Sequence, residues 1–227
     1  MGCSSDARGD VSGDVSGDAG SVAAHSAQDN AESISGPISF PPLPRISVWN
    51  KARYRVAQFW TGFTATVTEQ ELAEVAAQLP SAALALFLRM PVDARRHSIN
   101  VMQSVLAAGY AQRELLQAAL LHDVGKTVAD AAGARIGLWQ RGPLVLAETF
   151  TPGLLARSAC DAHDSGWRYA VYVQLNHPRL GADLAAAAGC DSLVCWLIAH
   201  HQTQAPPGTN PTAQQLLAAL QWADAQH

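Results

Sequence analysis

The sequence predicts an all-α protein. Aromatic residues make up only 7% of the 227 residues while alanine is abundant, and this composition favours helices over sheets. From residue 45 onward, apolar residues recur mostly at helical spacing. The one candidate strand is RYAVYVQL (168–175), which alternates weakly. We therefore expect a helical bundle preceded by a tail.

Three regions follow from the composition along the chain. Residues 1–44 include GDVSGDVSGDAG, which has too little apolar surface to offset the entropy of ordering it, so we expect a disordered tail. Residues 45–91 are expected to form N-terminal helices that pack on the core, and 92–227 the main domain. Within 45–91, Thr68 followed by Glu71 is a capping-box pattern that starts a helix, and Pro80 ends it. In order, helices are expected at 48–60, 68–79, 81–90, 97–110, 112–123, 135–150, 177–189 (with Pro178 at its first position), 190–201 and 211–227.

Charge and hydropathy exclude several classes of partner. The net charge is -4 and no cluster of Lys and Arg would follow a nucleic-acid backbone, so no nucleic-acid polymer is expected. No apolar run reaches the ~18 residues of a membrane span. The start, MGCSSDARGD, has neither a signal peptide nor a myristoylation signal, and a cytoplasmic location follows by default. The four cysteines form no zinc-like spacing, and the oligomeric state is open.

The histidines fall at the ends of two expected helical hairpins. His97 opens one helix and His122 closes the next, with a short turn at Gly109 between them. Helices joined so tightly run antiparallel, so both histidines lie at the same end. His177 and His200 repeat this arrangement around Gly189. Four histidines are therefore expected to converge.

Two aspartates and a lysine complete the predicted cluster. Asp123 follows His122 directly, and the last helix is long enough to bring Asp224 back to it. Imidazole and carboxylate together suit Mn, Fe, Co, Ni or Zn, and a bridging carboxylate can hold two such ions close together. Lys126 is placed to add positive charge for a phosphate.

These motifs resemble the HD-domain family of metal-dependent phosphohydrolases. The matching stretches lie within 92–226 and are RHSINV, LLHDVGK, NHPRLGA, the AHH pair and Asp224. In this order they are similar to the branch that holds two metals and cleaves cyclic dinucleotides. Two features depart from it: no GYP loop follows LLHDVGK, and Gln202 stands where glutamate is common.

The resemblance implies a fold, a ligand set and an activity. The fold is an all-α HD-domain bundle. The implied ligands are His97, His122, Asp123 and Asp224 for the first metal, and Asp123 as the bridge with His177 and either His200 or His201 for the second. The activity is hydrolysis of a phosphoester or phosphodiester of a nucleotide or cyclic dinucleotide by a water that bridges two divalent transition-metal ions such as Fe or Mn, with Asp123 and Lys126 in catalytic roles. The alternative is a catalytically weak module that senses nucleotides.

Several further residues are candidates beside this set. Asp93 lies four residues before His97, where the branch with an extra metal ligand has glutamate. Arg95 and Arg96 could reach a substrate phosphate or be solvated. For Trp139 and Arg141, a role in contacting substrate and an ordinary core or surface role are equally expected. His163 and Asp164 form a pair that lacks the surrounding motif, and His227 is expected to be a frayed chain end.

Overall fold

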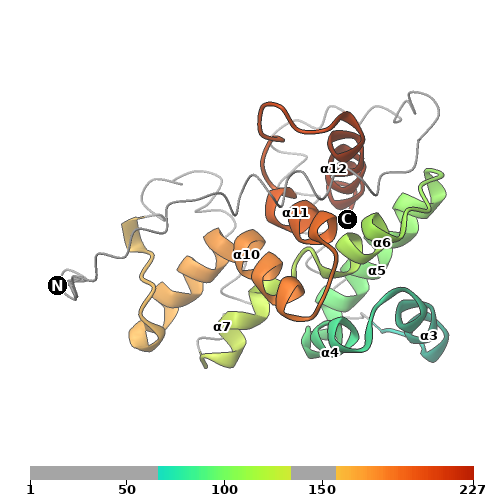
Figure 1. Ribbon diagram of the computed structural model, residues 1–227. Coiled ribbons are helices and arrows are strands. Elements are labelled where there is room, and N and C mark those ends of the chain that lie inside the picture. Colours follow the sequence, from blue (N-terminus) through green and yellow to red (C-terminus); the bar gives the residue numbers. More distant parts are fainter. Residues whose placement is uncertain (1–65, 134–156) are drawn as a thin grey trace, which may run out of the picture.

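The computed structural model describes residues 66–133 and 157–227, and every regular element in these ranges is helical (Figure 1). The all-α prediction is thereby confirmed for this part of the chain. The elements are α3 (Glu69–Gln78), α4 (Ser81–Arg89), α5 (Val92–Ala107), α6 (Arg113–Leu121), the 3-10 turn η1 (Val124–Lys126), α7 (Thr127–Ala131), η2 (His163–Ser165), α10 (Trp167–Ala187), α11 (Ser192–His200) and α12 (Pro211–Asp224). The expected tail and the expected helices at 48–60 and 135–150 lie outside the described residues.

Helix α6 forms the centre of the main apolar core. Its residues from Leu115 to Leu121 are all buried, including Gln117. A helix that is apolar almost all round must be covered on every side. Helices α3, α4, α5, α11 and α12 all contact it. Helix α6, at whose end the LLHDVGK motif begins, is therefore held by five neighbouring helices.

The starts of the first helices follow from capping residues. At α3 the capping box forms as predicted: Glu71 N–H donates to Thr68 Oγ1 at 3.3 Å, and Thr68 N–H donates to the Glu71 carboxylate at 2.9 Å. Pro80 and Pro91 occupy the N-cap positions of α4 and α5. Helix α5 begins at Val92, earlier than predicted, because Pro91 sets the start and the polar residues after it remain helical. His97 therefore lies in the second turn of α5 and not at its first residue.

Two hairpins, α5–α6 and α10–α11, are joined by the same type of turn. Gly109 has a φ of 88° and Gly189 a φ of 78°, in the left-handed region that favours glycine. In the first turn, Tyr110 N–H donates to Val105 O and Gly109 N–H to Leu106 O. Cys190 and Gly189 make the equivalent bonds to Ala185 O and Ala186 O. Both are Schellman motifs, which satisfy the last carbonyls of a helix and reverse the chain.

Helix α10 corrects two expectations. The candidate strand at 168–175 is helical, and the predicted helix start at His177 and Pro178 is wrong, because α10 runs unbroken from Trp167 to Ala187 with Pro178 inside it. The weak alternation was misleading, because the residues buried in this half of α10 include three consecutive ones, 169–171. Tyr169, Ala170 and Val173 form a second apolar cluster with Ala129 of α7. Helical packing therefore outweighs both the alternation and the proline.

No helix in the described ranges is both long and apolar enough to cross a membrane.

Candidate metal centre

Three side chains from three helices meet at the first group of possible metal ligands. His97 comes from α5, His122 caps the C-terminus of α6, and Asp224 is the last residue of α12. His97 Nε2 lies 3.3 Å from His122 Nε2 and 2.9 Å from Asp224 Oδ1. His122 Nε2 lies 3.4 Å from the same oxygen. We call these three residues the open triad, because His97 and Asp224 are 24% and 28% exposed.

A second group lies beside the first and is sealed from solvent. It consists of Asp123, His177 from the middle of α10, and His201 at the C-cap of α11. His177 Nε2 lies 3.3 Å from His201 Nε2 and 3.3 Å from Asp123 Oδ1, and His201 Nε2 lies 3.9 Å from that oxygen. Both histidine side chains are 0% exposed. We call these three residues the closed triad.

The separations within each triad fit a shared ion. Nitrogen and oxygen ligands bind ions such as Zn²⁺ at about 2.0–2.2 Å, so two ligands of one ion stand roughly 3.0–3.5 Å apart. Five of the six separations in the two triads fall at or close to this range, and the His201–Asp123 distance of 3.9 Å is the exception. Imidazole with carboxylate is also the donor set of transition metals. Each triad can hold one metal ion.

Asp123 links the two triads. Its Oδ1 faces His177 and His201, while its Oδ2 lies 3.7 Å from His122 Nε2 of the open triad. Lys126, one turn later, places its ammonium 2.7 Å from Oδ2. A carboxylate with one oxygen toward each group is placed to bridge two ions.

Close backbone contact puts Asp123 where it is. A Cβ added at Gly125 would lie 2.1 Å from the carbonyl oxygen of His177 and 2.6 Å from the backbone nitrogen of Gly181. A Cβ at Gly181 would lie 3.2 Å from Gly125 N. Turn η1 therefore lies directly on the backbone of α10, and only glycine leaves room at position 125. The two glycines of HDVGK and HPRLGA bring the bridging carboxylate to His177, a role that the sequence analysis missed.

Three of the four triad histidines are oriented by backbone carbonyls three residues earlier. His122 Nδ1 donates to Ala119 O at 3.0 Å and His201 Nδ1 to Ile198 O at 2.8 Å. His177 Nδ1 donates to Gln174 O at 2.7 Å. A carbonyl can only accept, so Nδ1 carries a proton in each ring and Nε2 is left to face the cluster. Such outer bonds fix the ring and its tautomer for metal binding.

The charges of the site hold the carboxylates ionised. Burial would raise the pKa of Asp123, but the charges of Lys126 and His122 outweigh it and hold this pKa well below its ordinary value. Burial also opposes the ionisation of Asp224, yet hydrogen bonds from His122 and His97 keep its pKa low.

The two buried C-cap histidines differ. Burial alone would lower the pKa of His122, but Asp123 and Asp224 outweigh burial and raise it to about 9. Burial and the neighbouring His122 lower the pKa of His201 to about 4. In the metal-free protein His201 is therefore ready as a neutral ligand, whereas His122 holds a proton that a metal ion must displace.

Of the two adjacent histidines in AHH, the structure places His201 in the cluster. His200 belongs to neither triad. Its Nδ1 donates to Trp196 O at 2.9 Å, and its ring stacks on the Trp196 ring with centroids 4.7 Å apart. A helix turns by 100° per residue, so the two neighbours point to different sides. The hairpin pattern predicted His200, where the structure has His201 in the cluster, and the resemblance left both open.

The other weighed residues lie outside both triads. Asp93 is in the first turn of α5, and Arg95 is half-buried on the same helix. Arg96 is held by Glu71 at 2.6 Å and by the carbonyl of Thr66, so it is bound within the protein. The His163 ring contacts the Tyr169 ring at a tilt of 35°, and Asp164 follows His163 in η2. Trp139 and Arg141 lie outside the described residues.

His227 corrects an expectation. It was interpreted as a frayed end, but its ring is half-buried and its Nε2 lies 2.8 Å from Ser104 Oγ of α5. The backbone N–H of His227 also donates a hydrogen bond to Asp224 O at 3.2 Å. The end of α12 is therefore attached to α5, which helps to hold Asp224 near His97.

Gln221 is a further supporting residue that the sequence analysis missed. Its Nε2 donates to Thr203 O at 2.7 Å and to His200 O at 3.2 Å. These carbonyls lie at the C-terminal end of α11 beside His201, and Gln221 is one turn before Asp224 on α12. This side chain therefore connects the helix end of the closed triad to the helix that supplies Asp224. A glutamine in an amphipathic helix gives no sequence signal for such a role.

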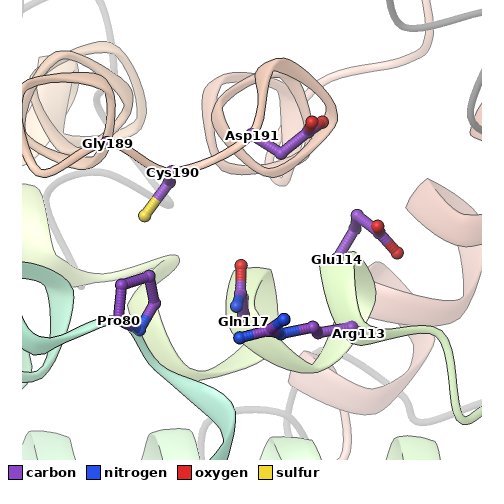
Figure 2. Close-up of a pocket in the computed structure, with 7 residues that line it drawn as sticks. All are labelled: Pro80, Arg113, Glu114, Gln117, Gly189, Cys190 and Asp191. Atoms are coloured by element: carbon purple, nitrogen blue, oxygen red, sulfur yellow. The ribbon is translucent and has the colours of Figure 1, made fainter.

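A cavity of about 210 Å³ lies at the other end of the hairpins (Figure 2). Its lining includes Arg113 and Gln117 near the start of α6, and Cys190 and Asp191 in the turn before α11. The triads lie at the C-terminal ends of these two helices, about 13 Å away along nine residues. None of the triad residues lines this cavity, so it is separate from the metal centre.

Comparisons with models of protein families, with curated proteins and with solved structures found no match.

Proposed function

We propose that this chain is a metal-dependent phosphohydrolase of the HD-domain type, which holds two divalent transition-metal ions and hydrolyses a phosphoester or phosphodiester of a nucleotide or cyclic dinucleotide. The observation that carries the proposal is Asp123, whose two oxygens face two separate triads. One buried carboxylate between two sets of ligands is an arrangement that a structural single-ion site does not need. It is the arrangement expected of a two-metal hydrolytic site.

Each triad has a different part in the proposed reaction. When bound, two such ions supply Lewis-acid stabilisation of the phosphoryl oxygens and activate water. His97 and Asp224, at the exposed edge, leave the open triad accessible to a substrate. His177 and His201 are buried and hold the bridging carboxylate from its inner side. Substrate is therefore expected to approach from the side of the open triad.

Lys126 is suited to contact the phosphate. Its side chain is 40% exposed, while its ammonium lies 2.7 Å from Asp123 Oδ2. The ammonium thus stands at the boundary between the buried carboxylate and solvent. A phosphate that binds at the open triad would meet this positive charge, which favours the charge that develops in the transition state.

The nucleotide part of the proposal comes from the order of the motifs. The sequence has RHSINV, LLHDVGK, NHPRLGA and AHH in the order of the two-metal branch, and both triads are built from these stretches together with Asp224. LLHDVGK is not followed by a GYP loop. The proposal therefore names nucleotides and cyclic dinucleotides as the substrate class and assigns no single one.

The test combines metal content with turnover. The full chain, purified without chelator from cells supplied with Mn and Fe, is analysed by elemental mass spectrometry and assayed with bis(p-nitrophenyl) phosphate, then with nucleotides and cyclic dinucleotides. We expect close to two ions per chain. In Asp123→Ala we expect at least one ion to be lost and turnover to fall at least about 100-fold. Asp183→Ala, which removes an exposed carboxylate paired with Arg179, is the matched control and should match the wild type.

Other outcomes would change the assignment. Two ions without turnover on any of these substrates would favour a nucleotide-sensing module. One ion per chain, retained in His177→Ala, would remove the closed triad from the proposal. No bound metal, even after reconstitution with Mn, Fe or Zn, would contradict the metal mechanism.

A further inference from the structure

The carbonyls that orient the triad histidines become available in two different ways. In a helix each carbonyl accepts from the N–H four residues later, and only the last four carbonyls lack such a partner. Ala119 is in the last turn of α6, and Ile198 is in the last turn of α11. Their carbonyls are therefore free to accept from His122 and His201 because the helices end there.

Gln174 differs because it lies in the interior of α10. This helix continues for thirteen residues beyond Gln174, so its carbonyl would ordinarily accept from the N–H of residue 178. Residue 178 is proline, which has no N–H and whose ring crowds the carbonyl four residues earlier. The carbonyl of Gln174 instead accepts from His177 Nδ1 at 2.7 Å. A mid-helix histidine thus obtains the same kind of bond that the other two obtain at helix ends.

We propose that Pro178 is a positioning residue for the metal ligand His177: it withholds a backbone N–H from Gln174 and so leaves that carbonyl to the imidazole. The proposal rests on the proposed metal centre. With Nδ1–H bonded to Gln174 O, the Nε2 of His177 faces Asp123 Oδ1 and His201 Nε2, each at 3.3 Å. Because His177 is 0% exposed, bulk water does not compete with this carbonyl for its Nδ1–H.

The helix geometry explains why an ordinary residue would serve less well. A carbonyl has two lone pairs, so it could accept from both a backbone N–H and an imidazole. A ladder bond, however, aligns the carbonyl with the helix axis, whereas the proline ring prevents that alignment. Alanine at position 178 would restore the ladder bond, and the bond from His177 Nδ1 would weaken. Proline in a helix interior costs about 3 kcal/mol relative to alanine, so its presence is not explained by helix stability.

The experiment therefore measures two quantities, the unfolding midpoint and the metal affinity of the closed triad, of which only the affinity should fall. The full-length Pro178→Ala variant is prepared metal-free. One sample is unfolded with urea, and a second, folded sample is titrated with Co²⁺, whose absorption reports the ligands of each ion. We expect the unfolding midpoint to stay the same or rise, while the affinity of the closed triad falls roughly 10-fold. The affinity of the open triad should stay within about 2-fold. Pro211→Ala is the matched control, since Pro211 stands at the first position of α12, where an N–H has no ladder partner.

A measurement without metal separates this inference from the proposed function. Ring ¹⁵N chemical shifts of His177, assigned by difference from His177→Gln, report which nitrogen carries the proton. The wild type should show the Nδ1–H form alone, and Pro178→Ala a mixture of both forms. A wild type with the proton on Nε2, an unchanged spectrum in Pro178→Ala, or unchanged closed-triad affinity would overturn the role of Pro178. A wild type that has the Nδ1–H form but binds no metal would contradict the proposed function and leave the carbonyl assignment standing.

Discussion

The two hairpins of this protein have the same plan but differ in the exposure of the histidine on their first helix. His97 precedes Gly109 by twelve residues, and His177 precedes Gly189 by the same number. In each hairpin the returning helix has nine residues and a histidine at its C-cap. Yet His97 of the first hairpin is 24% exposed, whereas His177 and His201 of the second hairpin are 0% exposed.

The difference comes from what covers each hairpin. The α5–α6 hairpin receives its third ligand from α12, and Asp224 is the last residue of that helix, so the triad is open at one edge. The α10–α11 hairpin receives η1, which lies against the α10 backbone through Gly125 and Gly181. Closed metal sites hold their ion for structure, whereas sites with an open position react. Under the proposed function, we therefore expect exchange and substrate contact at the first hairpin and a fixed supporting ion at the second.

The largest expected effect comes from separating the closed hairpin from η1. In Gly125→Ala the added Cβ would lie 2.1 Å from a backbone oxygen that cannot move alone, so η1 and α10 must part. We expect a loss of roughly 3 kcal/mol of unfolding free energy, typical of severe overpacking, and loss of closed-triad metal. Urea unfolding and metal analysis measure both. Gly181→Ala, with its nearest contact at 3.2 Å, should cost less than half as much, and equal costs would contradict the close contact.

The next effect tests the difference in burial directly. In the metal-free protein, His177→Ala should lower the unfolding free energy by roughly 2–3 kcal/mol, because it opens a buried cavity and removes the donor to Gln174 O. His97→Ala should cost about 1 kcal/mol or less, since its ring is partly solvated. Chemical denaturation of both variants supplies the comparison. A larger cost for His97→Ala would reverse the assignment of open and closed.

The sequence predicted the partners in this cluster better than their surroundings. Short turns and histidine placement were enough to place His97 and His122 together, because antiparallel helices leave little choice. Proline led the same reasoning to start a helix at Pro178, although α10 passes through that residue. The choice between His200 and His201, and the contact of Gly125 with α10, depend on helix rotation and backbone packing. The spacing of residues along the chain predicts neither the histidine that enters the cluster nor this backbone contact.

A smaller effect is expected where the two triads are connected. In Gln221→Glu the side chain keeps its length but offers no N–H to His200 O and Thr203 O. Helix α12 should shift at Asp224, and the open-triad affinity for Co²⁺ should fall roughly 10-fold, while the closed triad changes little. The matched control is Gln215→Glu on the same helix, whose amide faces Tyr110 Oη at 3.4 Å, away from both triads. Equal affinities in the two variants would mean that Gln221 only stabilises the loop.

The smallest effect concerns a tether beside the open triad. Arg96, next to His97, pairs with Glu71 of α3 at 2.6 Å, and hydrogen bonds from Arg96 and Thr68 lower the pKa of Glu71 from 4.5 to about 2. Since the pKa is lower in the folded protein, the pair stabilises the fold fully above about pH 4.5, and this contribution disappears as the pH falls toward 2. The pair is partly solvated, so we expect about 1 kcal/mol. Glu71→Gln keeps the capping-box pattern but cannot titrate. The difference in unfolding free energy between wild type and this variant should therefore shrink between pH 4.5 and 2, and a constant difference would show that Arg96 does not hold the start of α5 through this charge.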